Sequence, residues 1–162
     1  MMKHLFNGVL NSKSGRAGHA MLEFALGSSL LLAAFGGTFQ FGYTFYRYNT
    51  LATAVNDGAR YASVRPYNST TTTPKADFLL AVRNMVVYGD PAGGTTPVVP
   101  GLAITNVNLT PSFTNSAGVV LGVPTFMTVS ISGYQIDAIF AQTTLTGKPN
   151  VTYPYIGIYS PY

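Results

Sequence analysis

An uncharged stretch near the N-terminus constrains this chain more than any other feature. Residues 24–46 contain no charged side chain, and about 20 apolar residues suffice for a helix to cross a bilayer. A secretory signal has a shorter apolar core, of about 7–15 residues, and no acid at its edge. Glu23 stands at this edge, and a carboxylate beside a membrane span is costly and therefore usually functional. The stretch predicts a membrane-crossing helix with a functional acidic neighbour.

The positive charge of the chain is concentrated before this stretch. Lys3, Lys13 and Arg16 have no acidic residue beside them, and removing residues 1–18 leaves six basic and five acidic residues, a net charge of +1 instead of +4. By the positive-inside rule, such a leader holds the N-terminus in the cytoplasm. Nothing after the span forms a basic stripe, so we expect no nucleic-acid partner.

Two motifs flanking the span resemble a known family. R-A-G-H-A-M-L-E-F-A-L, which begins at Arg16, is similar to the processing site of the TadE-like family. This family comprises minor pilins or pseudopilins of the tight-adherence, type IVb pilus system. A-V-N-D-G-A-R-Y-A-S, residues 54–63, resembles the end of the long helix in that family. The resemblance covers residues 16–63.

The resemblance implies specific roles at both motifs. Residues 1–18 would be a prepilin leader, which a prepilin peptidase removes by cutting between Gly18 and His19. Glu23 and Phe24 would form the motif for processing and assembly. The motif at the helix end would consist of Asp57, Gly58, Ala59, Arg60 and Tyr61.

Small residues recur every four positions within the span and therefore share one helix face. These residues are Ala25, Ser29, Ala33 and Gly37. Small side chains let helix backbones approach closely in a membrane, so this face is a candidate for helix packing. The general abundance of small residues in membrane spans explains the pattern equally well.

The long helix is expected to run from His19 to Ser63 and to change character near residue 48. Beyond Arg47 an apolar stripe (Leu51, Val55, Ala59, Ala62) replaces the all-round apolar surface, as a helix needs if it supports a globular domain. Residues 19–48 would then lie in the membrane or a filament core, and residues 49–162 would form a periplasmic domain. Arg65-Pro66 ends the helix, because the residue before a proline avoids helical geometry.

The remaining sequence predicts a short helix and a small antiparallel sheet. The helix spans about 74–88, with Thr73-Pro74 at its start and Gly89 after its end. Strands are expected at about 102–110, 124–133 and 151–159, and Pro154 places the last at an edge of the sheet. The predicted fold class is α+β and pilin-like, with a long N-terminal helix.

Patterns typical of enzymes are missing from the sequence. It has no cysteine, and its two histidines, His4 and His19, fall in the leader and at the cleavage point. The four acids after Glu23 are scattered, and no phosphate-binding or nucleophile motif occurs. We therefore expect no enzymatic activity, cofactor, metal or small-molecule substrate.

The sequence favours a structural minor pilin or pseudopilin. It would enter the inner membrane with its N-terminus cytoplasmic and its domain periplasmic, and would then join a pilus at the cell surface. Its partners would be the prepilin peptidase, other pilin subunits, the inner-membrane assembly platform and the lipid bilayer. A permanent single-pass anchor or a secreted binding module is the alternative. The first residue of the mature chain distinguishes the three: His19 for a processed pilin, Met1 for a permanent anchor, and a residue near Thr38 for a secreted module.

Overall fold

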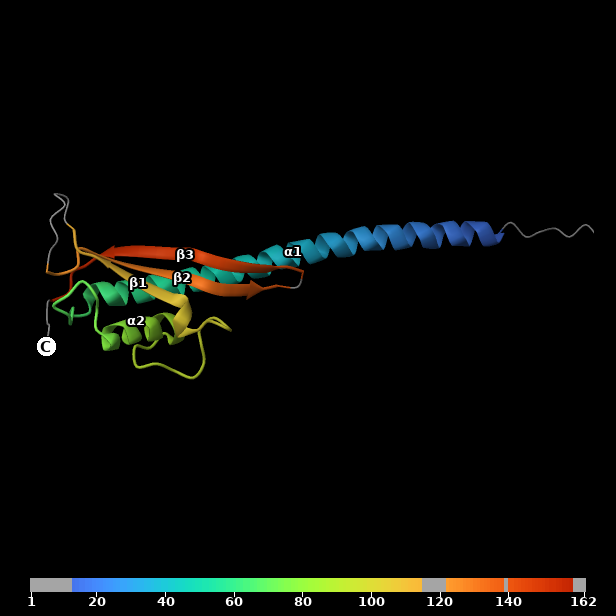
Figure 1. Ribbon diagram of the computed structural model, residues 1–162. Coiled ribbons are helices and arrows are strands. Elements are labelled where there is room, and N and C mark those ends of the chain that lie inside the picture. Colours follow the sequence, from blue (N-terminus) through green and yellow to red (C-terminus); the bar gives the residue numbers. More distant parts are fainter. Residues whose placement is uncertain (1–12, 115–121, 139, 159–162) are drawn as a thin grey trace, which may run out of the picture. The chain divides into compact units, whose positions relative to one another are not determined.

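The computed structural model describes residues 13–114, 122–138 and 140–158. The chain divides into two compact units, residues 1–39 and 40–162, and each is described by itself. Helix α1 (Lys13–Val64) contributes residues to both units. All the other helices and strands belong to the second unit (Figure 1).

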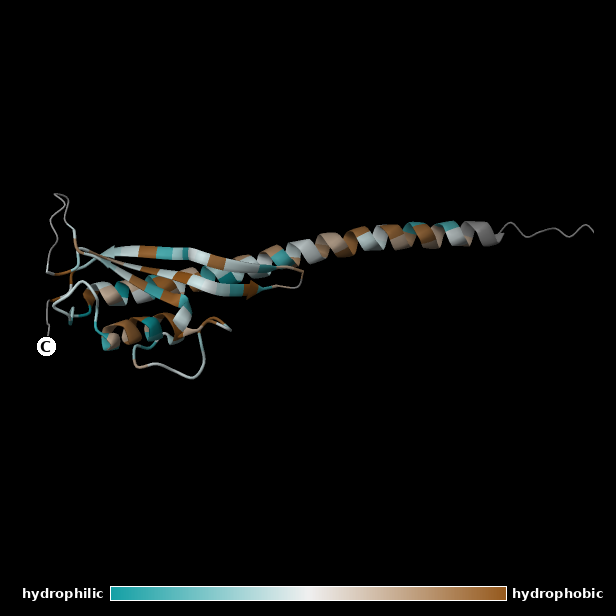
Figure 2. Ribbon diagram, in the orientation of Figure 1, coloured by the Kyte–Doolittle hydropathy of each residue, from teal (hydrophilic) through white to brown (hydrophobic). Residues whose placement is uncertain are grey.

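The described part of the first unit is helical and covered with exposed apolar side chains. Met21, Phe24 and Leu30 are among the most exposed, and Figure 2 shows the brown colour of apolar residues along this part of α1. The helix is long and apolar enough to cross a membrane by its length and composition, and its apolar window is not buried at all. The hydroxyls of Ser28 and Ser29 donate to helix carbonyls one turn earlier, at 3.1 and 2.8 Å.

In the second unit, α1 buries one face and exposes the other. Leu51, Val55, Ala59 and Ala62 are fully buried, whereas the polar side chains between them are exposed. The apolar stripe predicted beyond Arg47 is therefore confirmed. The helix continues one residue past Ser63, to Val64, and stops before Arg65-Pro66 as expected.

The C-terminal segment of the chain caps the end of α1. Helix ends leave carbonyl groups without helical partners, and here the Ser63 carbonyl accepts hydrogen bonds from the backbone N–H groups of Ile156 and Gly157, both at 3.0 Å. The Tyr155 hydroxyl donates to the Arg65 carbonyl (3.0 Å) and accepts from the Tyr67 N–H (2.7 Å). The end of α1 is thus fixed by residues about 90 positions away in the sequence.

Helix α2 (Ala76–Tyr88) begins two residues later than predicted. Thr73, which was expected to cap the start of this helix, is held in a different turn, because the Thr71 hydroxyl donates to the Thr73 carbonyl at 3.1 Å and accepts from the Thr73 N–H. Such local side-chain bonds compete with helix formation, and Lys75 becomes the N-cap without a side-chain bond. The predicted end is correct: Gly89 adopts φ 74° and donates to the Met85 carbonyl.

The three strands form one antiparallel sheet in the order β1-β2-β3. The first predicted strand was placed too early, because residues Ile104–Asn106 form a 3₁₀ turn and β1 spans Val107–Ser112. β2 (Phe126–Asp137) extends beyond the predicted end, and β3 (Gln142–Pro154) starts nine residues before the predicted start. β3 is an edge strand, as predicted, but it ends at Pro154 and not at about residue 159.

Register shifts explain why the long β2–β3 hairpin was not recognised. The pairing is irregular between Ser130 and Tyr134, and Gly133 and Gly147 adopt φ values of 71° and 67°. The alternation of buried and exposed residues therefore changes phase within β2. The first half of β3 is rich in threonine and has few apolar residues, so periodicity gives almost no strand signal there.

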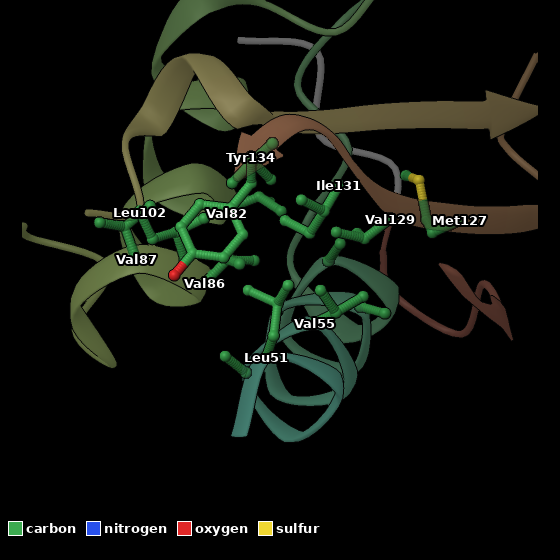
Figure 3. Close-up of a cluster of buried hydrophobic side chains, with 14 of the residues drawn as sticks. Leu51, Val55, Val82, Val86, Val87, Leu102, Met127, Val129, Ile131 and Tyr134 are labelled. Atoms are coloured by element: carbon green, nitrogen blue, oxygen red, sulfur yellow. The ribbon is translucent and has the colours of Figure 1, made fainter. Parts of the chain in front are cut away.

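A single hydrophobic core joins α1, α2 and the sheet. Figure 3 shows Leu51 and Val55 of α1 facing Val82 and Val86 of α2, with side chains of β2 on another side. The buried β2 residues are Met127, Val129, Ile131, Tyr134 and Ile136. The predicted α+β, pilin-like architecture is therefore confirmed: a long apolar N-terminal helix, a short second helix and a three-stranded antiparallel sheet.

Candidate functional segments of the long helix

The expected processing motif lies within helical backbone. Gly18, His19, Glu23 and Phe24 are all exposed residues of α1. The helix was expected to start at His19 but begins at Lys13, so it includes the Gly18–His19 bond. No proline interrupts residues 13–18, and nothing there blocks helical geometry. A Cβ added to Gly18 would meet nothing within 4 Å, so this fold does not itself require a glycine.

The predicted packing face is exposed along its whole length in the first unit. Its members are Ala25, Ser29, Ala33 and Gly37. The Ser29 hydroxyl is turned onto the Leu26 carbonyl, at 2.8 Å, and a Cβ on Gly37 would have no neighbour within 4 Å among the described residues. This face is sterically open to another helix.

The motif at the helix end is divided between the core and the surface. Gly58 and Ala59 are buried, whereas Asp57 and Arg60 are exposed. A Cβ on Gly58 would lie 2.1 Å from Val86 Cγ2, so α2 approaches the helix backbone too closely for any side chain there. Gly58 is therefore the position where α2 packs against the backbone of α1.

Tyr61, the last residue of this motif, lies at the edge of the hydrophobic core. Its hydroxyl accepts a hydrogen bond from the Arg65 guanidinium, which also lies over the Tyr61 ring at 5.6 Å and over the Phe78 ring at 5.7 Å. A cation above an aromatic face is attracted by the ring quadrupole. The motif therefore links the end of α1 to α2.

Open hollows border α1, and two of them lie beside the motif at the helix end. One, of about 330 Å³, is lined by Tyr46, Asn49, Thr50, Thr53, Ala54, Asp57, Met85, Gly89 and Val98. The next, of about 270 Å³, is lined by Asp57, Arg60, Tyr61, Val64 and Met85. Among the described residues no cluster of His, Cys, Asp or Glu could hold a metal ion. These hollows offer shape and apolar surface rather than reactive groups.

The perturbed ionisable groups serve the structure of the second unit. The Asn68 amide donates to the Asp77 carboxylate at 2.7 Å and lowers the pKa of that carboxyl. Burial raises the pKa of the Tyr155 hydroxyl and of the Tyr134 hydroxyl. Tyr134 donates to the Pro100 carbonyl at 2.9 Å, so its hydroxyl fixes a loop.

Sequence reasoning missed one residue of the long helix, Gln40. Its Nε2 donates to the Ala141 carbonyl at 3.1 Å, and its Oε1 accepts from the Phe140 N–H at 2.9 Å. One side chain thus joins α1 to the turn between β2 and β3. The available signal was that Gln40 is the single amide side chain in residues 24–46.

Comparison with known proteins found a family match over part of α1. Residues 18–60 match the model of a family described as TadE-like protein. The matched segment contains Gly18 and Glu23 and ends at Arg60, so it covers most of each motif but only about a quarter of the chain. No curated protein and no solved structure matches the chain. The globular part beyond residue 60 lies outside the match.

Proposed function

We propose, from the match of residues 18–60 to the TadE-like family, that this chain is a structural minor pilin or pseudopilin of a type IVb tight-adherence pilus. Proteins of this family are associated with pilus assembly and are structural proteins rather than enzymes. Residues 19–48 insert into the inner membrane, and residues 49–162 fold in the periplasm. A prepilin peptidase cuts after Gly18, and the mature chain joins other pilin subunits through the inner-membrane assembly platform.

The contrast between the two parts of α1 carries the proposal. In the second unit the apolar stripe is fully buried, whereas the apolar window of the helix has no buried residues. Large exposed apolar surfaces mark contacts with membranes or proteins. A pilin meets both needs, because its helix lies first in lipid and later among neighbouring subunits.

Glu23 has a role that follows from the chemistry of cleavage. A carboxylate at the edge of the bilayer needs a charged partner to offset its desolvation. Cutting after Gly18 creates an α-amino group on His19, four residues before Glu23, and the same amine on a neighbouring subunit can pair with Glu23 in a filament. Such a pair would set the axial register of the subunits.

The mature N-terminus tests this proposal directly. In cells with a prepilin peptidase, mass spectrometry of the wild-type chain should show His19 as the first residue. Gly18→Val should stay full length, since a side chain before the scissile bond obstructs the peptidase. Gly27→Val is the matched control, because a Cβ at either glycine meets nothing within 4 Å, and it should be cut normally.

Other N-termini would reject the assignment. A wild-type chain that begins at Met1 would be a permanent anchor, and one that begins near Thr38 would be a secreted module. Recovery of mature Gly18→Val would contradict cleavage at this site.

A further inference from the structure

Two charged side chains of the motif at the helix end are not used by the described fold. Gly58 and Ala59 of this motif are buried, whereas Asp57 and Arg60 are exposed. Residues three positions apart share one face of a helix and can pair. Within the described part of the chain, however, Asp57 and Arg60 make no hydrogen bond or ion pair, with each other or with any other residue. Internal packing therefore does not account for these two charges.

Both charged side chains line a hollow between α1 and α2 that lies wholly in the second unit. This hollow, of about 270 Å³, also has the side chains of Val64 and Met85 in its lining, and Val64 is 49% exposed. Asp57 and Met85 line the larger hollow as well, so the two hollows adjoin. An acid and a base thus stand beside an open apolar surface. Protein interfaces have the same layout, with apolar groups at the centre and polar groups at the rim.

The two opposite charges make this surface complementary to itself. They lie about 4.5 Å apart along the helix axis, at 1.5 Å per residue. When two copies of a protein meet across a two-fold axis, the same patch contacts itself. If Asp57 faces the partner's Arg60, then Arg60 must face the partner's Asp57, and one contact forms two ion pairs. A patch with two like charges would instead repel its own copy.

The strength of such a contact determines where it can form. Exposed ion pairs are individually weak and are screened by salt, and the hollow offers few apolar side chains. The contact is therefore too weak to hold separated domains together in dilute solution. Insertion of the chains into one membrane confines their domains to a thin layer, which raises the effective concentration of the patch. Chains in one membrane also share one orientation, so a two-fold axis along the membrane normal can relate them.

We propose that this chain pairs with a second copy of itself in the membrane, through the surface formed by Asp57, Arg60 and the hollow beside them. Two reciprocal Asp57–Arg60 ion pairs hold the contact. The inference rests on the proposed membrane insertion. The charges favour a second copy as the occupant, because an anionic surface such as a lipid headgroup layer would be repelled by Asp57 as much as it is attracted by Arg60.

Single-cysteine variants can test this contact, since the chain contains no cysteine. Full-length Asp57→Cys and Arg60→Cys copies with different affinity tags would be co-expressed, and their isolated membranes treated with a short bis-maleimide cross-linker. A disulfide requires Cα atoms within about 7 Å, and an Asp–Arg pair reaches farther, so a linker is needed. The opposite ion pair of the same contact stays intact in this mixture. Two tagged Thr144→Cys copies are the control, because Thr144 is also exposed in the second unit but lies on β3.

We expect the mixed copies to give several times more cross-linked product than the Thr144→Cys copies. Adding Arg60→Asp to the Asp57→Cys copy sets an acid against the partner's Asp57. This change should lower the yield by about fivefold, the factor that corresponds to an exposed ion pair of about 1 kcal/mol. Adding Asp57→Arg to the Arg60→Cys copy as well should restore the yield, because the remaining pair again has opposite charges.

Carbonate extraction of the same membranes keeps this contact separate from the proposed insertion. If the variants resist extraction but the mixed yield equals that of Thr144→Cys, the contact is refuted and membrane insertion stands. If carbonate releases the chain, the proposed insertion fails and the contact fails with it. A yield that falls on charge reversal but does not recover with the second reversal would assign Asp57 and Arg60 to a different protein, and would overturn the pairing of two copies.

Discussion

Replacing Gly58 by alanine should lower the stability of the globular unit by about 2 kcal/mol. A Cβ at this position would lie 2.1 Å from Val86 Cγ2, whereas carbon atoms in contact are about 3.5–4.0 Å apart. Val86 is fully buried and cannot turn into solvent. Helix α2 must therefore move away from α1, which loosens the packing along the whole interface.

The magnitude is the balance of two opposing effects. Overpacking a close-packed core costs about 1–3 kcal/mol, and the complete burial of Val86 favours the upper end of that range. Alanine in a helix interior is about 1 kcal/mol more favourable than glycine. The difference leaves a net loss of about 2 kcal/mol.

Guanidinium unfolding of the full chain in detergent, followed by the near-UV circular dichroism of its tyrosines, measures this change. Gly42→Ala is the control on the same helix, because its Cβ would meet nothing within 4 Å; it should be neutral or stabilising by up to about 1 kcal/mol. The double variant Gly58→Ala/Val86→Ala should lose less than the two single losses added together. Wild-type stability of Gly58→Ala, or strict additivity in the double variant, would refute the steric argument.

Three further predictions concern other parts of the chain. Tyr155→Phe should destabilise the second unit by about 1 kcal/mol at neutral pH, since the Arg65 carbonyl and the Tyr67 N–H lose the hydroxyl as a partner while the Tyr67 N–H keeps the Ile158 carbonyl. Burial raises the pKa of the Tyr155 hydroxyl. The contribution of this hydroxyl to stability is therefore fully present below about pH 10, the pKa of tyrosine in the unfolded chain, and is lost at higher pH. Unfolding curves recorded at increasing pH should show a smaller loss of stability for Tyr155→Phe than for the wild type. Glu23→Ala should still be processed and remain in the membrane but fail to enter pili, as sheared-pilus blots would show; wild-type incorporation would remove the proposed pairing role. A fragment of residues 49–162 should be a soluble monomer by light scattering, because its apolar stripe is buried, and association would place that stripe at a subunit interface.

Local patterns were sufficient for the helices and for part of the sheet. The stripe from Leu51 to Ala62 has helical spacing, and its burial follows from amphipathicity alone. Gly89 ends α2 because its left-handed backbone is a local property of glycine. Met127, Val129 and Ile131 alternate with polar residues, so β2 was recognisable wherever its register is regular.

Interactions between distant residues decided the features that sequence reasoning missed. The first half of β3 has no apolar alternation and forms because β2 supplies its hydrogen-bonding partners. The start of α2 is a local exception, because the Thr71 hydroxyl binds the Thr73 backbone and the helix begins only at Ala76. The end of α1 depends on Tyr155 and Gly157 near the C-terminus, a pairing that no local pattern encodes.

The sequence by itself determined an apolar N-terminal helix, its processing-like motif and its change to a one-sided stripe, because charge and hydropathy along one helix are local quantities. Only the tertiary structure revealed that Gly58 admits α2 against the backbone and that Gln40 holds a turn 100 residues away. Glycine and glutamine have many uses in a helix. Which use applies depends on the neighbour that folding brings to them.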